Sequence, residues 1–289
     1  MMLTVFTPAY NRAAYLNRLY DSLIRQESKD FEWLIVDDGS TDNTSQTVQS
    51  FMEQRKLEIR YVRKENGGKH TAYNEALQHA RGAWFLCVDA DDQLAENAVA
   101  LLTRAIKTVS AGTAIAAYKT DMDGKRLSDP FPAGVDTCKI SDLALRLGCR
   151  GEFTFVFPTD IARKYPFPVF PGEKFVGESV VYDRLERECP VHLLGEVITE
   201  CEYLGDGYSM NFGALMGRNP TGFCLYFLQR IDLAPTFAAA LTHAGKYWCF
   251  RWISGSRQLR YDGPRKGVCA LGWPVGVVFR LYYKLLRGF

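Results

Sequence analysis

The sequence has no pair of cysteines at CxxC spacing, and its four histidines do not fall at a spacing typical of a metal site. The eight cysteines are scattered, which argues against a disulfide framework and predicts reduced thiols in a cytosolic setting. No apolar run approaches the roughly 20 residues needed to span a bilayer, and the N-terminus lacks a signal pattern. These absences favour a cytoplasmic globular protein over a secreted or membrane-spanning one.

Positive charge is concentrated at the C-terminal end of a chain whose composition is otherwise ordinary. The 289 residues are 47% hydrophobic and 24% charged, which suits one large domain or a domain with an appendage. The net charge is +2, but the segment from Lys246 to Phe289 contains nine Lys or Arg residues and one acid, Asp262. The rest of the chain therefore carries −6 (2 minus 8), and the basic, aromatic end predicts an anionic partner.

Short apolar runs alternate with helical patterns over the first part of the chain, which predicts an α/β fold with a mostly parallel central sheet flanked by helices. After residue 120 the chain is rich in loops, and a helical, aromatic region follows. We predict a domain over 1–215, with halves 1–110 and 111–215, and a helical extension over 216–289. The expected strands are 3–7, 31–37, 57–62, 83–89 and 113–118, and the expected helices include 13–26, 43–54, 96–109 and 222–252.

Four polar clusters, "TPAYNR", "DDGSTDNT", "ENGGKHT" and "DADD", each follow a predicted strand. Because ligands bind beyond the carboxyl ends of parallel strands, we expect all four clusters to meet at one edge of the sheet. In "DADD", Asp89, Asp91 and Asp92 crowd negative charge that a hard divalent cation would neutralise. The alternative is a solvated loop in which Asp91 or Asp92 caps the next helix.

The other clusters offer groups that suit a nucleotide. Gly68 and Lys69 precede a helix whose N-terminus favours anions, although a flexible turn with a solvated lysine is the alternative. Tyr10 offers a flat surface for a base, or else packs in the core. Asp37 and Asp38 could accept hydrogen bonds from a base or a ribose, or else cap a helix.

Together, "TPAYNR", "EWLIVDDGSTDNT", "ENGG…AYNEAL" and "RGAWFLCVDADD" resemble the inverting GT-A nucleotide-sugar glycosyltransferases of family 2, strongly over residues 2–110 and more weakly over 150–205. The resemblance implies a GT-A, Rossmann-like fold and a Mn²⁺ or Mg²⁺ site in which Asp91 is the direct ligand and Asp89 supports it. Relatives often read A-R-N where this chain has "AYN", so Lys69 or Arg12 would supply the charge facing the phosphates. The implied nucleotide-sugar site comprises Thr7, Pro8, Tyr10, Asn11, Arg12, Asp37, Asp38, Gly68, Lys69, Asp89 and Ala90.

An inverting transfer also needs a carboxylate that takes the proton of the acceptor hydroxyl. The segment "FPGEKFVGESVVYDRL" supplies two candidates, and the resemblance favours Glu178 over Glu173. Relatives commonly have a Glu-Asp pair where this chain has Glu178 and Ser179, which leaves one obvious carboxylate. The alternative is that Glu178 only places charge at a helix N-terminus.

The C-terminal stretch "PVGVVFRLYYKLLRGF" places Arg280, Lys284 and Arg287 at i, i+4 and i+7 on an apolar helix. Such a basic stripe predicts binding to an anionic membrane surface, which would suit a lipid-linked acceptor. The alternative is a helix that packs on its own domain. No recognised nucleic-acid-binding module is present, so nucleic acid is not an expected partner.

The sequence thus predicts a metal-dependent inverting hexosyl- or N-acetylhexosaminyltransferase that works at the cytosolic face of a membrane in polysaccharide biosynthesis. The donor is a nucleotide sugar, with UDP as the expected nucleotide, and the acceptor is a glycan or a lipid-linked intermediate. A catalytically silent, sugar-nucleotide-binding subunit of an assembly complex is the alternative of a different class. A nucleotidyltransferase would also use metal-binding aspartates beside a parallel sheet, but the motif set fits it poorly.

Overall fold

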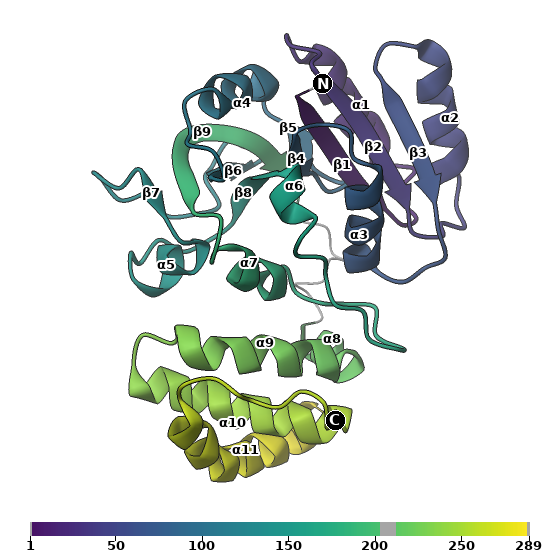
Figure 1. The fold of residues 1–289 in the computed structure, drawn as a ribbon. Coiled ribbons are helices and arrows are strands. Elements are labelled where there is room, and N and C mark those ends of the chain that lie inside the picture. Colours follow the sequence, from purple (N-terminus) through teal and green to yellow (C-terminus); the bar gives the residue numbers. More distant parts are fainter. Residues whose placement is uncertain (1, 203–211, 288–289) are drawn as a thin grey trace. The chain divides into compact units, whose positions relative to one another are not determined.

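The computed structural model describes residues 2–202 and 212–287, which fall into two compact units (Figure 1). The first unit combines Met1–Pro166 with Leu185–Leu204, and the second combines Phe167–Arg184 with Gly205–Phe289. The division predicted from the sequence, 1–215 and 216–289, differs because the segment 167–184 groups here with the C-terminal helices. That segment carries both candidate bases, so the candidate bases and the strand-end clusters belong to different units.

Among the described residues, the first unit contains one nine-stranded sheet. The strands are β1 (Leu3–Ala9), β2 (Phe31–Asp37), β3 (Ile59–Arg63), β4 (Trp84–Cys87), β5 (Gln93–Leu94), β6 (Ala114–Asp121), β7 (Thr137–Cys138), β8 (Phe153–Pro158) and β9 (Val191–Cys201). They follow the order β3-β2-β1-β4-β8-β6-β9-β5, and β7 also pairs with β9 (Figure 1). Strands β1 to β4 pair in parallel as predicted, whereas β8 runs antiparallel between β4 and β6. The sheet is therefore parallel over its first half and mixed beyond β4.

The helices begin and end within a few residues of their predicted positions in the first half of the chain. One predicted helix, 222–252, is instead two helices, because the Ala234-Pro235 step interrupts it. The helices are α1 (Leu16–Arg25), α2 (Thr44–Gln54), α3 (Lys69–His79), α4 (Ala98–Ile106), α5 (Ile140–Leu145), α6 (Thr159–Ala162), α7 (Ser179–Leu185), α8 (Phe212–Arg218), α9 (Pro220–Leu233), α10 (Phe237–Ser254) and α11 (Lys266–Arg287).

Helices cover both faces of the sheet in the first unit. Every residue of β2 is buried, as expected for a strand with apolar layers on both sides. On one face, Leu3 and Val5 join the buried cluster formed by the apolar side chains of α1, α2 and α4. On the other face, the Tyr73 ring of α3 lies edge-on to Phe6, with ring centroids 5.9 Å apart. Packing on both faces makes the strands a firm support for the loops that follow them.

The second unit is a group of helices with its own aromatic core, in which Phe223, Phe227, Tyr247 and Phe250 are buried. The segment 167–184 belongs to this unit through polar contacts as well as packing. Asp183 forms an ion pair with Arg230 on α9, with 2.9 Å between Oδ1 and Nη2. These contacts explain why the segment groups with the C-terminal helices.

Helices α10 and α11 approach each other closely through glycines. A Cβ atom added to Gly272 would lie 2.4 Å from the Cβ of Ala244, and one added to Gly276 would lie 2.9 Å from the carbonyl oxygen of Gly245. Both distances are far below an ordinary van der Waals contact, so only glycine fits at these positions. The hairpin of α10 and α11 therefore depends on a seam of small side chains.

All eight cysteines lie within the described residues and all are free thiols, as their scattered spacing predicts. Within 2–202 and 212–287, no helix combines the length and the apolar character needed to cross a membrane.

The glycine seam generates a prediction about the stability of the second unit. Gly272→Ala should lower the free energy of unfolding by about 1–3 kcal/mol, because the added methyl group has no room against α10. Gly267→Ala, near the start of the same helix, meets no atom within 4 Å and should raise stability by about 0.5–1 kcal/mol. Chemical unfolding followed by circular dichroism gives both values, and equal effects of the two substitutions would contradict the seam.

Candidate functional site

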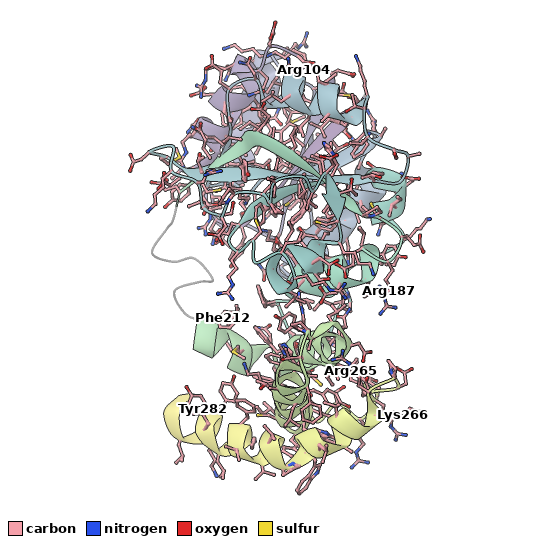
Figure 2. The ribbon with its side chains drawn as sticks, turned by 90° about the vertical axis from the view of Figure 1, so that its left-hand side faces the viewer. Arg104, Arg187, Phe212, Arg265, Lys266 and Tyr282 are labelled. Atoms are coloured by element: carbon pink, nitrogen blue, oxygen red, sulfur yellow. The ribbon has the colours of Figure 1, made fainter. Side chains whose placement is uncertain are left out.

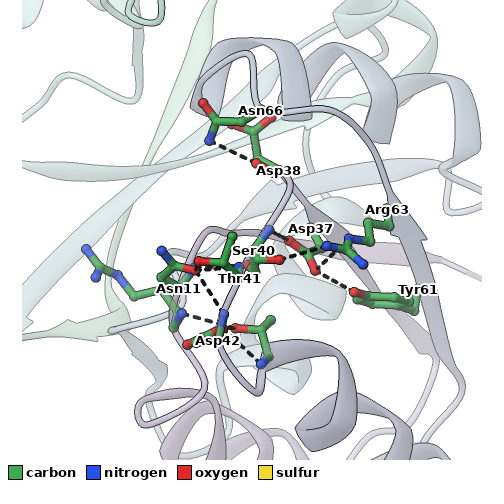
Figure 3. A network of polar contacts seen from close by, with 11 residues as sticks. Asn11, Asp37, Asp38, Ser40, Thr41, Asp42, Tyr61, Arg63 and Asn66 are labelled. Atoms are coloured by element: carbon green, nitrogen blue, oxygen red, sulfur yellow. Dashed lines mark hydrogen bonds and ion pairs between the residues drawn. The ribbon is translucent and has the colours of Figure 1, made fainter.

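The carboxyl ends of β1 to β4 lie at one edge of the sheet, so the four polar clusters do converge. Figure 3 shows part of the result, in which the loops after β1, β2 and β3 are joined by hydrogen bonds. The ring of Tyr10 is 48% exposed beside these loops, so it does not pack in the core. An exposed aromatic face at this edge is what a stacked base would need.

Asn11 joins the loop after β1 to the loop after β2. Its backbone has φ of 53°, a left-handed conformation that asparagine tolerates better than most residues. Its side-chain oxygen accepts hydrogen bonds from the backbone N–H groups of Thr41 at 2.8 Å and Asp42 at 3.3 Å (Figure 3). Its own N–H donates to Ser40 Oγ at 2.9 Å. Asn11 is thus mainly a residue that shapes the site.

Asp37 has no exposed surface, and its carboxylate is hydrogen-bonded within the protein. Its carboxylate accepts from the Ser40 N–H at 2.7 Å and from the Tyr61 hydroxyl (Figure 3). Burial, together with the Asp37 hydrogen bond, raises the pKa of Tyr61 to about 12, so this hydroxyl stays a donor. Thr7 is also fully buried, and its hydroxyl accepts from Trp33 Nε1 at 2.9 Å. The burial of Thr7 and Asp37 disfavours direct contact with a base.

Asp38 joins the loop after β2 to the glycine-rich loop after β3. Its two carboxylate oxygens accept from the N–H groups of Gly67 at 2.9 Å and Gly68 at 2.7 Å. The ammonium group of Lys64 lies 2.7 Å from the same carboxylate. Gly68 has φ of 95°, which requires glycine at the start of α3. The anion at this helix start is therefore the protein's own Asp38.

Asp89 and Lys69 form a close ion pair between the loop after β4 and the start of α3. The Lys69 Nζ atom lies 2.7 Å from one carboxylate oxygen of Asp89 and 2.8 Å from the other. Burial raises the pKa of Asp89, but the positive charges of Lys69 and Lys119 outweigh it and hold that pKa below its usual range. The lysine is therefore not a solvated side chain on a flexible turn.

Asp91 differs electrostatically from Asp89. Burial and the neighbouring Asp89 charge raise the pKa of Asp91 above its usual range, so added positive charge would stabilise its carboxylate. The carbonyl oxygen of Asp91 accepts a hydrogen bond from Arg18 on α1. The other guanidinium nitrogen of Arg18 lies 2.7 Å from Glu202, just beyond β9. Arg18 thus fixes the backbone that presents the Asp91 carboxylate.

Asp92 does not cap the next helix, so that alternative is wrong for this residue. It is buried, with 6% exposure, and its carboxylate lies 3.7 Å from Lys119 Nζ on β6. The following helix, α4, begins at Ala98, six residues after Asp92, with Asn97 as its N-cap, and the short strand β5 intervenes. The physical reason is that β5 pairs with β9 and carries the chain away before α4 can start.

Sequence reasoning missed three cations that complete this edge: Arg18, Lys64 and Lys119. Lys64 directly follows β3, so its strand-end position could have identified it. The other two had no local signal, because Arg18 lies within a helix and Lys119 lies within a strand. Arg18 and Lys119 contact the acidic loop only through the tertiary fold.

The two candidate bases have different environments in the second unit. Glu173 is buried, and its carboxylate accepts from the N–H groups of Thr221 at 2.6 Å and Gly222 at 2.9 Å. These bonds cap the start of α9 and engage both carboxylate oxygens, which makes Glu173 less suited than Glu178 to accept a proton. Glu178 is exposed and lies immediately before α7, where its carbonyl oxygen accepts from Val181 and Tyr182.

The residues at the sheet edge fit a divalent cation only in part. Among the residues that the structure describes, no cluster of three or more His, Cys, Asp or Glu side chains could hold a metal ion. Asp91 nevertheless offers a carboxylate in a negative environment, and magnesium sites of this kind take one or two carboxylates plus substrate phosphates. The fit therefore requires oxygen ligands from a bound substrate.

Comparison with known proteins agrees with this geometry. The sequence profile described as Glycosyl transferase family 2 matches residues 4–150. Glycosyltransferase GlyG of Streptococcus pneumoniae is 30% identical over 148 residues, which cover 50% of this chain and 48% of GlyG. TarS of Staphylococcus aureus, a poly(ribitol-phosphate) beta-N-acetylglucosaminyltransferase, is 35% identical over 96 residues, which cover 32% of this chain and 17% of TarS. The chain spans about half or less of the length of these relatives.

Solved structures share the fold at lower sequence identity. The structure of S. aureus TarS 1–349 with UDP-GlcNAc has a TM-score of 0.61 and 18% identity, covering 98% of this chain and 81% of that one. The mannosyltransferase PcManGT of Pyrobaculum calidifontis, with GDP-Man and Mn²⁺, has a TM-score of 0.57 and 20% identity, covering 98% and 87%. These likenesses confirm the GT-A fold. With the family profile matching just over half of its length, this chain belongs to glycosyl transferase family 2.

Proposed function

We propose that this glycosyltransferase moves a sugar from a UDP-linked donor to an acceptor hydroxyl with inversion at the anomeric carbon. The observation that carries the proposal is the strand-end edge itself, where the exposed Tyr10 and the Asp89, Asp91 and Lys69 charges follow the parallel strands of the sheet. A nucleotide sugar needs both features, an aromatic surface for the base and charged groups for the diphosphate. The family membership of the chain supports the same reading.

Different residues of this edge contact different parts of the donor. Tyr10 stacks on the base, and Asp38, whose buried carboxylate accepts from Gly67, Gly68 and Lys64, orders the glycine loop beside it. Lys69 exchanges part of its contact with Asp89 for the donor phosphates, and Arg12 adds positive charge from the loop after β1. The backbone at Pro8, Gly68 and Ala90 borders the same space. Asn11 and Asp37 act by holding these loops in place.

Mn²⁺ or Mg²⁺ fits this proposal, with Asp91 as the direct ligand and Asp89 in support. The ion, when bound, neutralises charge that develops on the departing diphosphate. Asp91 provides a carboxylate whose pKa is raised by burial and by the charge of Asp89, and Arg18 keeps its backbone in position. The raised pKa of Asp91 means that positive charge placed beside it stabilises the ionised form.

The transfer itself is an in-line displacement. The acceptor oxygen forms a bond to the anomeric carbon as the bond from that carbon to the diphosphate oxygen breaks. Glu178 accepts the proton of the acceptor hydroxyl, and the nucleoside diphosphate leaves with the electron pair. Glu173 is less suited to this step because its carboxylate accepts two hydrogen bonds at the start of α9.

We propose a glycan or a lipid-linked precursor of a surface polysaccharide as the acceptor, and a hexose or N-acetylhexosamine as the transferred sugar. Relatives with polymer-forming names support this, since they include a chondroitin synthase and a hyaluronan synthase of Pasteurella multocida. We place the enzyme at the cytosolic face of a membrane, where the basic C-terminal segment meets anionic lipid. A silent nucleotide-binding subunit remains the alternative, and turnover decides between them.

Glu178→Gln should abolish transfer and leave UDP binding intact, because the amide keeps its shape but cannot take the proton. A loss of at least about 100-fold in nucleotide release is expected, with unchanged UDP affinity by calorimetry. Glu173→Ala is the contrasting variant, which should lower the free energy of unfolding by about 1 kcal/mol through loss of the α9 cap. Wild-type turnover in Glu178→Gln would show that another group is the base.

Metal removal tests the cation site. A chelator should stop nucleotide release from a panel of UDP- and GDP-sugars, and Mn²⁺ or Mg²⁺ should restore it. Asp91→Asn should need a higher metal concentration for the same rate, because it removes the direct ligand. Turnover that survives the chelator would refute the metal proposal, and a folded chain that binds UDP but turns over no donor would favour the silent subunit.

Arg18→Met tests whether the backbone contact to Asp91 matters for the ion. The substitution keeps the aliphatic stem and removes both guanidinium contacts, so affinity for Mn²⁺ in the presence of UDP should fall about 10- to 100-fold. Electron paramagnetic resonance of unbound Mn²⁺ measures this without any turnover. Arg25→Met, on the exposed side of the same helix, is the matched control, and equal affinities in the two variants would contradict the role of Arg18.

A further inference from the structure

Helix α11 exposes an unusual amount of apolar surface. Seven of its large apolar side chains are between 37% and 80% exposed: Leu271, Trp273, Val277, Val278, Leu281, Tyr282 and Leu285. Figure 2 shows the helix in yellow between the labelled Lys266 and Tyr282, with side chains projecting from the side turned away from α9 and α10. We call these seven residues the α11 apolar face. Isolated exposed leucines are ordinary, but a continuous apolar face on one helix marks an interaction site.

The face is continuous because its residues recur at helical spacing. Val278, Leu281 and Leu285 follow one another at i, i+3 and i+7, so they share one side of the helix. Trp273 and Val277, four residues apart, form one flank, while Leu271 and Tyr282 form the other. The opposite side of α11 is the glycine seam against α10, which is buried. The hairpin therefore presents the face without needing to rearrange.

The basic stripe predicted from the sequence is only partly presented by the described side chains of α11. Arg280 is only partly exposed, and one of its guanidinium nitrogens is buried without a hydrogen-bond partner in the described part of the chain. Its charge acts on Cys249 of α10, so it belongs to the packed side of the helix. Lys284 is exposed, and the side chain of Arg287 lies outside the described residues. The surface that α11 presents is apolar, with cations at its margin.

We propose that the α11 apolar face inserts into the surface of a lipid bilayer, with the helix axis parallel to the membrane plane. This rests on the membrane location proposed above and specifies how it is reached: apolar side chains enter the acyl boundary, and cations contact headgroups. Aromatic residues on both flanks, Trp273 and Tyr282, suit the interface, where a ring can keep one polar edge hydrated. The helices within the described residues cannot span a membrane, so a position in the plane remains.

Charge favours lipid over a second copy of the chain as the occupant. The segment from Lys246 to Phe289 has nine basic residues against one acid, and Arg257, Arg260, Lys266 and Lys284 are exposed in it. A second copy would bring another surplus of the same sign towards the first, which costs energy. Anionic headgroups would neutralise that surplus and contribute roughly 1 kcal/mol per cation near the surface. Lipid therefore satisfies both the apolar face and the charge beside it.

The test uses the full chain and vesicles of phosphatidylcholine with phosphatidylglycerol, sedimented in the presence of the protein. The double variant Val278→Glu/Leu285→Glu should lower the bound fraction at least about 10-fold, because it places two acids in the centre of the face. Met122→Glu is the control, since Met122 is also an exposed apolar residue, at 42%, but belongs to the first unit. Lys284→Ala should have a smaller effect than the double variant.

Salt and fluorescence identify the mode of binding. Raising NaCl to about 0.5 M screens headgroup attraction, so binding that depends on apolar insertion should persist. Brominated acyl chains should quench tryptophan fluorescence, and Trp273→Phe should remove much of that quenching. Unchanged sedimentation of the double variant would overturn the proposal. A lipid-free dimer that the double variant converts to monomer would also overturn it and assign the face to a second copy.

The membrane proposal and the catalytic proposal can be tested independently of each other. The double variant should release nucleotide from donor in detergent solution at the wild-type rate, because α11 takes no part in donor binding. Glu178→Gln should bind vesicles as the wild type does. Loss of vesicle binding in Glu178→Gln would show that the face alone does not account for attachment, which would contradict the proposal.

Discussion

The strand-end edge of the sheet depends on the buried carboxylate of Asp38. Three donors meet it: the N–H groups of Gly67 and Gly68 and the ammonium group of Lys64. A buried charge is costly unless it is paired and hydrogen-bonded, so removing these partners would leave the carboxylate uncompensated. The bonds also fix where α3 begins, and hence where Lys69 stands. The position of Lys69 in turn determines which acid of the loop after β4 is neutralised.

The acidic loop is therefore a set of carboxylates with different partners. Lys69 pairs with Asp89, Lys119 faces Asp92, and Asp91 keeps the least compensated charge. Three acids in four positions looked uniform in the sequence, but tertiary contacts give each a separate role. The protein separates a residue suited to binding a cation from residues that hold the loop, although all three carry the same functional group.

Sequence periodicity predicted the parallel first half of the sheet well, because buried strands and their turn residues are local signals. It also predicted that four loops converge, since that follows from strand direction alone. It did not predict the antiparallel β8, whose place between β4 and β6 depends on contacts between residues distant in sequence. The surroundings of Glu173 and Arg280 were missed for the same reason: each is decided by a packed neighbour, α9 for Glu173 and α10 for Arg280.

Pro274 limits how deeply helix α11 can enter a lipid bilayer. Pro274 lies inside the helix and has no N–H, so the carbonyl of Ala270 lacks the donor that a regular helix would supply. Both residues are exposed. Hydrocarbon cannot hydrogen-bond to such a carbonyl, whereas the hydrated headgroup layer can. If this carbonyl faces the lipid, the helix axis would therefore lie at the level of the glycerol backbone, where water still reaches the carbonyl. Only the apolar side chains would then extend towards the acyl chains.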